Sequence, residues 1–173
     1  MINRISDAVL LLGSNSGDRI YYLSQAIRMI NEKCGTTVSC SSLYETSPWG
    51  YLSQPDFLNQ CLVTETFLSP EILLTEIKKI ETSLGRIVSE KWKERIIDID
   101  ILFFNHDIIS KTELIIPHPM IAQRKFTLVP LHEIIPQYVH PVLKKNMEQL
   151  LNECADEGKV NLLQLEKTGN EEK

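Results

Sequence analysis

The sequence of 173 residues lacks the features that mark zinc, redox and membrane proteins. Its four cysteines never show the Cys-x-x-Cys spacing of a zinc or redox motif, and scattered free thiols are typical of a reducing compartment. No apolar run is long enough to span a bilayer, and the N-terminus lacks the basic and apolar regions of a signal peptide. We therefore expect a cytoplasmic protein that binds no membrane.

An excess of positive charge is also missing. The formal net charge is −5, which argues against general electrostatic binding of nucleic acid but not against a local basic pocket for a phosphorylated small molecule. Internal repeats and low-complexity linkers are absent as well. The composition therefore fits one domain over residues 1–165, and the charged end at residues 166–173 is expected to be disordered.

The order of the predicted elements indicates the fold class. Apolar and alternating runs predict strands, and apolar residues at helical spacing predict helices. In chain order these are a strand at 8–12, a helix at 20–34, strands at 36–45 and 60–67, a helix at 70–84 and a strand at 95–104. This β-α-β-β-α-β order predicts an α+β, ferredoxin-like core, an antiparallel sheet with both helices on one face, followed by C-terminal additions. We expect the last strand to lie in the middle of the molecule, beside the first and third strands.

That last strand carries an electrostatic conflict. Side chains alternate along a strand, so Asp98 and Asp100 share one face with Leu102 and Phe104, while Phe103 belongs with the isoleucines on the other face. Neighbouring like charges repel, and a bound cation removes the conflict. Mg²⁺ is the natural candidate, because it takes carboxylate oxygens and commonly shares its shell with phosphates. The motif alone leaves open a polar strand end that simply meets water.

Cations lie on both sides of the aspartates along the chain. A polyphosphate needs such cations, although a solvated loop has the same composition. Trp92 can cover a nucleotide base or can simply pack, and the prolines around His118 make it rigid enough to donate a hydrogen bond to phosphate. The cationic residues are Arg86, Lys91, Lys93, Arg95 and, downstream, Arg124.

A third group of residues suits a flat heterocycle. Thr46, Trp49, Phe57 and Asn59 combine aromatic faces with hydroxyl and amide groups, as stacking and edge hydrogen bonds require. An ordinary loop and strand start remains the alternative. By contrast, Gly13-Ser14 is interpreted as a structural turn, because a second spaced glycine and a Lys-Ser/Thr pair are missing.

Taken together, these motifs resemble those of the 6-hydroxymethyl-7,8-dihydropterin pyrophosphokinases, enzymes of folate synthesis. The resemblance runs from Leu12 to about Leu151. Its most specific parts are Ser42-Leu43-Tyr44-Glu45-Thr46, Gln54-Pro55-Asp56-Phe57-Leu58-Asn59, Glu81 with Gly85-Arg86, the run from Arg95 to Ile101, Pro117-His118-Pro119 and Arg124-Lys125-Phe126.

The resemblance implies transfer of a pyrophosphoryl group from the co-substrate ATP to the pterin hydroxymethyl group, leaving AMP, by a protein expected to be a monomer. It implies that Asp98 and Asp100 hold two Mg²⁺ ions and that Arg86 and Arg95 act with them in catalysis. For ATP it implies contacts from Lys78, Glu81, Trp92, Ile101, His118 and Arg124. For the pterin it implies contacts from Thr46, Ser47, Trp49, Phe57, Asn59 and Phe126.

Other readings stay open at this point. An Asp-x-Asp nucleotidyltransferase would release pyrophosphate, although its Gly-Ser pair normally lies shortly before the aspartates. A non-catalytic ferredoxin-like module would bind a ligand without chemistry. The segment between Arg86 and Arg95 also looks one residue shorter than in the familiar family pattern, so which of its residues contact phosphate is left undecided.

Overall fold

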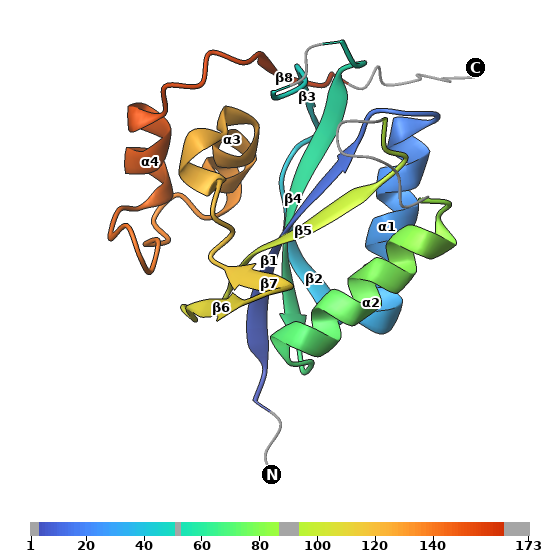
Figure 1. Ribbon diagram of the computed structural model, residues 1–173, viewed down its shortest axis with the longest axis vertical. Coiled ribbons are helices and arrows are strands. Elements are labelled where there is room, and N and C mark those ends of the chain that lie inside the picture. The colour runs from blue at the N-terminus through green and yellow to red at the C-terminus, as the bar shows by residue number, and fades with distance from the viewer. Residues whose placement is uncertain (1–3, 51–52, 87–93, 165–173) are drawn as a thin grey trace, which may run out of the picture.

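The computed structural model describes residues 4–50, 53–86 and 94–164. The strand at the centre of its fold is β1 (Ser6–Ser14) (Figure 1). Its last seven residues are buried, because both faces of the sheet are covered at this strand. Leu10 and Leu12 point into one core, whereas Val9 and Leu11 point into a second core on the opposite face. The apolar run recognised in the sequence is thus a strand packed on both sides.

The sheet is antiparallel, with the order β5-β1-β4-β3-β8, and β2 also pairs with β4. The expectation that the aspartate strand lies beside both the first and the third predicted strands is wrong. β5 pairs with β1 and forms one end of this order, because β4 occupies the other side of β1. The bounds are β2 (Thr36–Cys40), β3 (Tyr44–Thr46), β4 (Phe57–Thr66), β5 (Asp98–Phe104) and β8 (Val160–Leu162).

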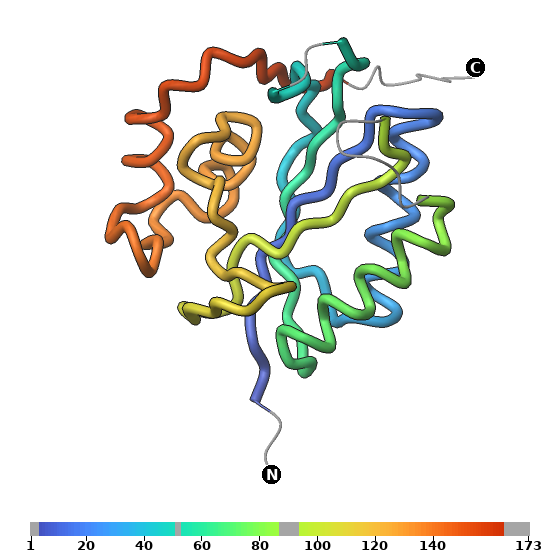
Figure 2. The backbone as a smooth tube through the Cα atoms, in the orientation of Figure 1, coloured from blue at the N-terminus to red at the C-terminus, as the bar shows by residue number. Residues whose placement is uncertain are grey.

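Two helices cover one face of the sheet, α1 (Arg19–Lys33) and α2 (Pro70–Ser83), as Figures 1 and 2 show. Both begin at capping residues: the carboxylate of Asp18 accepts from the Tyr21 N–H and the hydroxyl of Ser69 accepts from the Ile72 N–H. α1 ends before Gly35, whose φ is +154° and where a Cβ would lie 2.1 Å from the carbonyl oxygen of Glu65. This arrangement confirms the ferredoxin-like α+β core.

The C-terminal additions cover the opposite face. They pack on Val9, Leu11 and Phe103 of the sheet and form a third layer beside it (Figure 1). Pro130 lies inside the longer of the two α-helices of this layer and is buried there. The elements are a hairpin of β6 (Ile109–Lys111) and β7 (Leu114–Ile116), a 3-10 turn (Ile121–Gln123), α3 (Lys125–Ile134) and α4 (Met147–Glu153).

A β-bulge in β5 corrects the predicted alternation. Val9 pairs with Phe103 but Leu10 pairs with Ile101, so Leu102 is the extra residue. Phe103 therefore points to the α3 side and Phe104 to the α1 and α2 side, opposite to the prediction. Asp98 and Asp100 precede the bulge, so their predicted common face is preserved.

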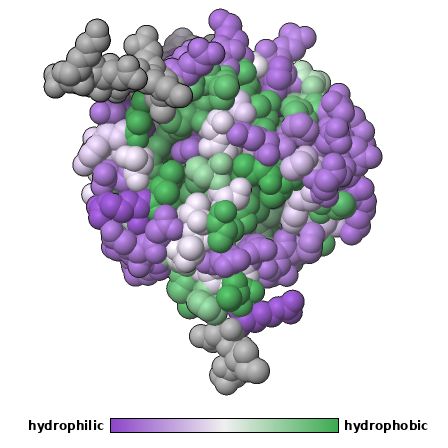
Figure 3. All heavy atoms as spheres, turned by 180° about the vertical axis from the view of Figure 1, so that it is seen from behind, coloured by the Kyte–Doolittle hydropathy of each residue, from purple (hydrophilic) through white to green (hydrophobic). Residues whose placement is uncertain are grey.

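The surface seen from behind in Figure 3 has hydrophobic side chains across its middle, between hydrophilic flanks. Among the large apolar side chains that the structure exposes are Val38 in β2 and Phe67 just after β4. Within the described ranges, no helix combines the length and apolar character needed to cross a membrane.

Candidate active site

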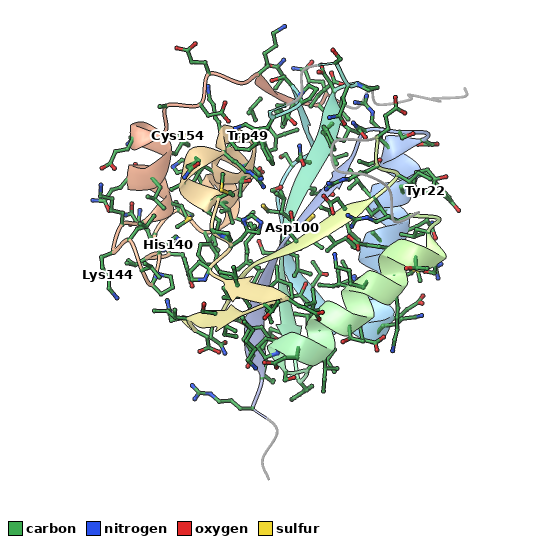
Figure 4. The ribbon with its side chains drawn as sticks, viewed as in Figure 1. Tyr22, Trp49, Asp100, His140, Lys144 and Cys154 are labelled. Atoms are coloured by element: carbon green, nitrogen blue, oxygen red, sulfur yellow. The ribbon has the colours of Figure 1, made fainter. Side chains whose placement is uncertain are left out.

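A cavity of about 340 Å³ opens between one end of the sheet and the start of α3. Trp49 and Asp100, labelled in Figure 4, both lie toward the α3 side of the sheet. All six residues predicted for the pterin line this cavity, together with four of those predicted for phosphate and metal. The lining residues are Leu11, Gly13, Thr46, Ser47, Trp49, Gln54, Phe57, Asn59, Arg95, Asp98, Asp100, Arg124 and Phe126.

The first predicted metal ligand, Asp98, is held between two arginines. Arg86 Nη1 lies 2.7 Å from Asp98 Oδ1, and Arg95 Nη1 contacts Asp98 Oδ2. Both guanidinium groups are partly buried, so the ion pairs are less screened than surface pairs. The two predicted catalytic arginines are thereby brought to the predicted metal site.

The second aspartate, Asp100, is in a different environment. Burial and, after it, the charge of the Asp98 carboxylate raise the pKa of Asp100 to about 7, while the charges of Lys78 and Arg124 oppose the shift. Its carboxylate makes no hydrogen bond or ion pair with other residues in the described part of the chain. A carboxylate in this condition is stabilised by a cation that adds positive charge at the site.

The raised pKa predicts an unusual pH dependence of stability. Between the ordinary value of 3.8 and about 7, Asp100 keeps its proton in the folded protein and loses it in the unfolded chain. The native state then binds more protons, so this group lowers the free energy of unfolding as the pH rises. We expect Asp100→Asn to exceed the wild type in stability by about 1–2 kcal/mol at pH 8 and to match it near pH 4.

Urea unfolding in the absence of divalent cations checks this prediction. His118 contributes the opposite slope, because its pKa is lowered, but it does so in both proteins and cancels in their difference. A stability difference that stays constant across this pH range would contradict the assignment to Asp100.

A buried carboxylate, Glu81, ties α2 to the aspartate strand. Glu81 is 2% exposed and accepts from the Ile99 backbone N–H at 2.8 Å. It also pairs with Lys78 Nζ at 3.1 Å and contacts Arg86 Nη1. Glu81 and Lys78 do not line the cavity. Glu81 is connected to the cavity residue Asp98 through Arg86, which pairs with both carboxylates.

His118 and Ile101 are not among the residues that line the cavity. The His118 backbone N–H donates to the Leu102 carbonyl at 2.9 Å, and Nδ1 accepts from the Met120 N–H at 3.2 Å. Burial, followed by the charge of Arg124, lowers the pKa of His118 to about 4, so the neutral ring carries its proton on Nε2. Ile101 packs its side chain in the core with α1 and α2.

The other half of the cavity combines an amide pair with aromatic rings. Asn59 Nδ2 donates to Thr46 Oγ1 at 2.7 Å, and both side chains are buried. A Cβ on Gly13 would lie 2.9 Å from Asn59 Oδ1, so the glycine lets this amide approach β1.

Arg124 joins this half of the cavity to the aspartates. Its Cζ lies 4.8 Å from the centre of the Trp49 ring and 5.6 Å from that of Phe126. Its buried Nε has no hydrogen-bond partner among the described residues, and burial lowers the pKa of the guanidinium despite the opposing charges of Asp100 and Asp98. The cation is thus positioned between an aromatic pocket and two carboxylates.

Comparison with known proteins decides among the open readings. The model of the 7,8-dihydro-6-hydroxymethylpterin-pyrophosphokinase (HPPK) family matches residues 9–136. The chain belongs to this family. The enzyme class inferred from the resemblance, a pyrophosphokinase, is therefore confirmed.

Relatives of this chain agree with it in sequence and in fold. The chain is 41% identical over 138 residues to the 2-amino-4-hydroxy-6-hydroxymethyldihydropteridine pyrophosphokinase of Aquifex aeolicus, covering 80% of this chain and 86% of the relative. The enzyme of the same name from Bacillus subtilis is 44% identical over 131 residues, covering 75% and 78%. Wild-type HPPK-DHPS of Plasmodium falciparum with pteroate shares the fold, with a TM-score of 0.73 and 23% identity over 87% of this chain and 42% of that chain.

One residue at the site to which the sequence gave no role is Asn15. Its Oδ1 accepts from the Arg95 backbone N–H at 2.7 Å, and its own N–H donates to the Arg95 carbonyl at 3.0 Å. Asn15 also donates to the Pro55 carbonyl at 3.4 Å. Asn15 thereby fixes the backbone of Arg95 at the cavity. The sequence signal that could have pointed to Asn15 is its position directly after the Gly13-Ser14 turn. Trp92, assigned to ATP, lies outside the described residues, as does the predicted tail at 166–173.

Proposed function

We propose that the chain transfers the pyrophosphoryl group of ATP to the hydroxymethyl group of 6-hydroxymethyl-7,8-dihydropterin, giving AMP and the pterin diphosphate. The observation that carries the proposal is one cavity in which paired carboxylates and arginines adjoin an aromatic and amide pocket. A phosphate donor and a flat heterocyclic acceptor need these two environments side by side.

Asp98 and Asp100 would hold two Mg²⁺ ions. Hard carboxylate oxygens fit this metal, and Asp100 is a largely buried carboxylate that makes no hydrogen bond or ion pair within residues 4–50, 53–86 and 94–164. No group of three or more His, Cys, Asp or Glu side chains suited to a metal occurs in the described ranges, so phosphates and water would complete the coordination. Bound Mg²⁺ would neutralise phosphate charge and polarise the phosphoryl group.

The protein groups would align the substrates and balance their charge. Arg86 and Arg95 would turn from Asp98 to phosphate oxygens, and Arg124 would approach the triphosphate from the aromatic side. His118 would donate a hydrogen bond from Nε2, which matches its neutral state. Phe57 and Phe126 would stack on the pterin while Asn59 and Thr46 bind its edge. Alignment and charge neutralisation would therefore carry catalysis.

An assay of AMP release from ATP and Mg²⁺, with and without hydroxymethyl-dihydropterin, tests this function. AMP that appears only with the pterin supports it. Release of pyrophosphate would instead indicate a nucleotidyltransferase, and ATP binding that needs no Mg²⁺ and leads to no turnover would indicate a ligand-binding module.

The aromatic half of the cavity gives a separate prediction. Phe57→Ala should raise the KM for the pterin at least tenfold, because a stacking face is lost, and should change the KM for ATP by less than about threefold. Phe67→Ala is the matched control, since Phe67 is 62% exposed and lies just after the other end of β4. Equal changes in both KM values would place Phe57 outside the pterin pocket.

A further inference from the structure

Residues 156–159, here called the C-terminal strap, connect the two walls of the cavity. One wall contains Ser47, which follows β3, and the other contains Arg124 and Phe126 at the start of α3. The strap lies between α4 and β8 and outside the residues that the family model matches. Its contacts reach both walls.

On the α3 wall, the strap supplies a missing helix cap. Arg124 occupies the N-cap position of α3 but makes no side-chain capping bond. Asp156 Oδ2 instead accepts from the Lys125 backbone N–H at 2.9 Å. A carboxylate at this end also interacts favourably with the helix dipole. Asp156 thus fixes the backbone between the two lining residues, Arg124 and Phe126.

On the Ser47 wall, the same aspartate shapes the strap itself. Asp156 Oδ1 accepts from the Gly158 N–H at 2.9 Å, which turns the chain toward β3. Lys159 then pairs with Ser47 in both directions, its N–H donating to Ser47 Oγ at 3.0 Å and its carbonyl accepting from the Ser47 N–H at 3.1 Å. A Cβ on Gly158 would lie 3.0 Å from Asp156 Oδ1 and 3.3 Å from Ser47 Oγ, so the approach is close.

We propose that Asp156 is a positioning residue for the acceptor pocket, setting the distance between the Ser47 wall and the Arg124 and Phe126 wall. One carboxylate oxygen holds the α3 wall at Lys125, and the other holds the strap at Gly158, next to the Lys159 backbone that bonds Ser47, although the Asp156 side chain does not line the cavity. The proposal rests on the proposed function, because the heterocycle bound between these walls is the pterin acceptor.

Steady-state kinetics of Asp156→Ala test this role. We expect the KM for the pterin to rise roughly five- to twentyfold, since two charge-assisted hydrogen bonds are lost, and kcat and the KM for ATP to change by less than about threefold. Asp156→Asn keeps one acceptor oxygen and should recover part of the affinity. Glu157→Ala is the matched control, because the neighbouring carboxylate is exposed and makes no hydrogen bond or ion pair in the described part of the chain.

A purely structural role predicts a different pattern. Asp156→Ala would then lower the melting temperature and the active fraction while leaving the KM for the pterin within twofold of the wild type, and this result would overturn the proposal. If Asp156→Ala does not fold, Asp156→Asn decides by the same criterion. Binding of 6-hydroxymethylpterin, followed by its fluorescence, supplies a readout without turnover. If the wild-type chain releases no AMP, the proposed function is contradicted. The affinities of the wild type and Asp156→Ala for 6-hydroxymethylpterin then test the role of Asp156 by themselves.

Discussion

Replacing Asp98 or Asp100 by asparagine is expected to lower the rate of pyrophosphoryl transfer by about a thousandfold or more. The amide keeps the size of the side chain but removes the negative charge that would hold Mg²⁺. Asp100→Asn should fold at least as well as the wild type, since its buried charge is costly. Asp98→Asn leaves Arg86 and Arg95 with one weaker partner, so a small loss of stability is expected there.

Two measurements separate loss of metal from loss of structure. Mn²⁺ binding in the presence of a non-hydrolysable ATP analogue should weaken strongly in both variants, while circular dichroism should be unchanged. Asp107→Asn serves as control, because Asp107 is exposed and lies just beyond the same strand. Near-normal turnover in either active-site variant would refute the assignment of the metal to these aspartates.

Arg95→Ala is expected to lower kcat by about 100- to 1000-fold while changing the dissociation constant of the pterin by less than about threefold. Arg95 lines the cavity beside Asp98, where its charge would stabilise the phosphoryl group in transfer. Its backbone is held by Asn15, so removal of the side chain should leave the loop in place.

The control for this variant is Arg28→Ala, which removes an exposed arginine paired with Glu32 on α1. Arg95→Lys distinguishes charge from geometry and should recover activity only in part, because lysine cannot make two parallel hydrogen bonds to phosphate. An Arg95→Ala enzyme with an unchanged kcat would exclude Arg95 from the reaction.

Local sequence signals predicted the helices well, but the sheet depended on distant contacts. The capping residues Asp18 and Ser69 act within their own turns, so the sequence shows where each helix begins. The predicted strand at 36–45 is instead two strands, β2 and β3. The chain leaves the ladder at Ser41, where the hydroxyl accepts from the Cys61 N–H at 3.0 Å. That contact spans 20 residues and has no signature in the local pattern.

For the site, residue type predicted the roles that a side chain can fill by its own chemistry. It did not predict the roles that depend on contacts between segments far apart in the sequence. Aromatic rings, amides and hydroxyls suit a heterocycle wherever they lie, and the four residues predicted from type alone, Thr46, Trp49, Phe57 and Asn59, all line one cavity. The ion pair of Asp98 with Arg86 depends on the packing of α2 against β5, and the contact of Asn15 with Arg95, 80 residues away, depends on the pairing of β1 with β5. The contacts predicted for ATP stay predictions, since Lys78, Glu81, Ile101 and His118 lie outside the cavity lining.

The pairing of Asp98 with Arg86 and Arg95 would make binding of the proposed ligand an exchange of ionic partners. A magnesium–nucleotide complex would bring cations for the carboxylate and anions for the arginines, so contacts between opposite charges would be replaced rather than added. Few counter-ions from the solvent would then be released, in contrast to an anion entering an unpaired basic cleft. The affinity of this site for its charged substrate should accordingly depend only weakly on ionic strength.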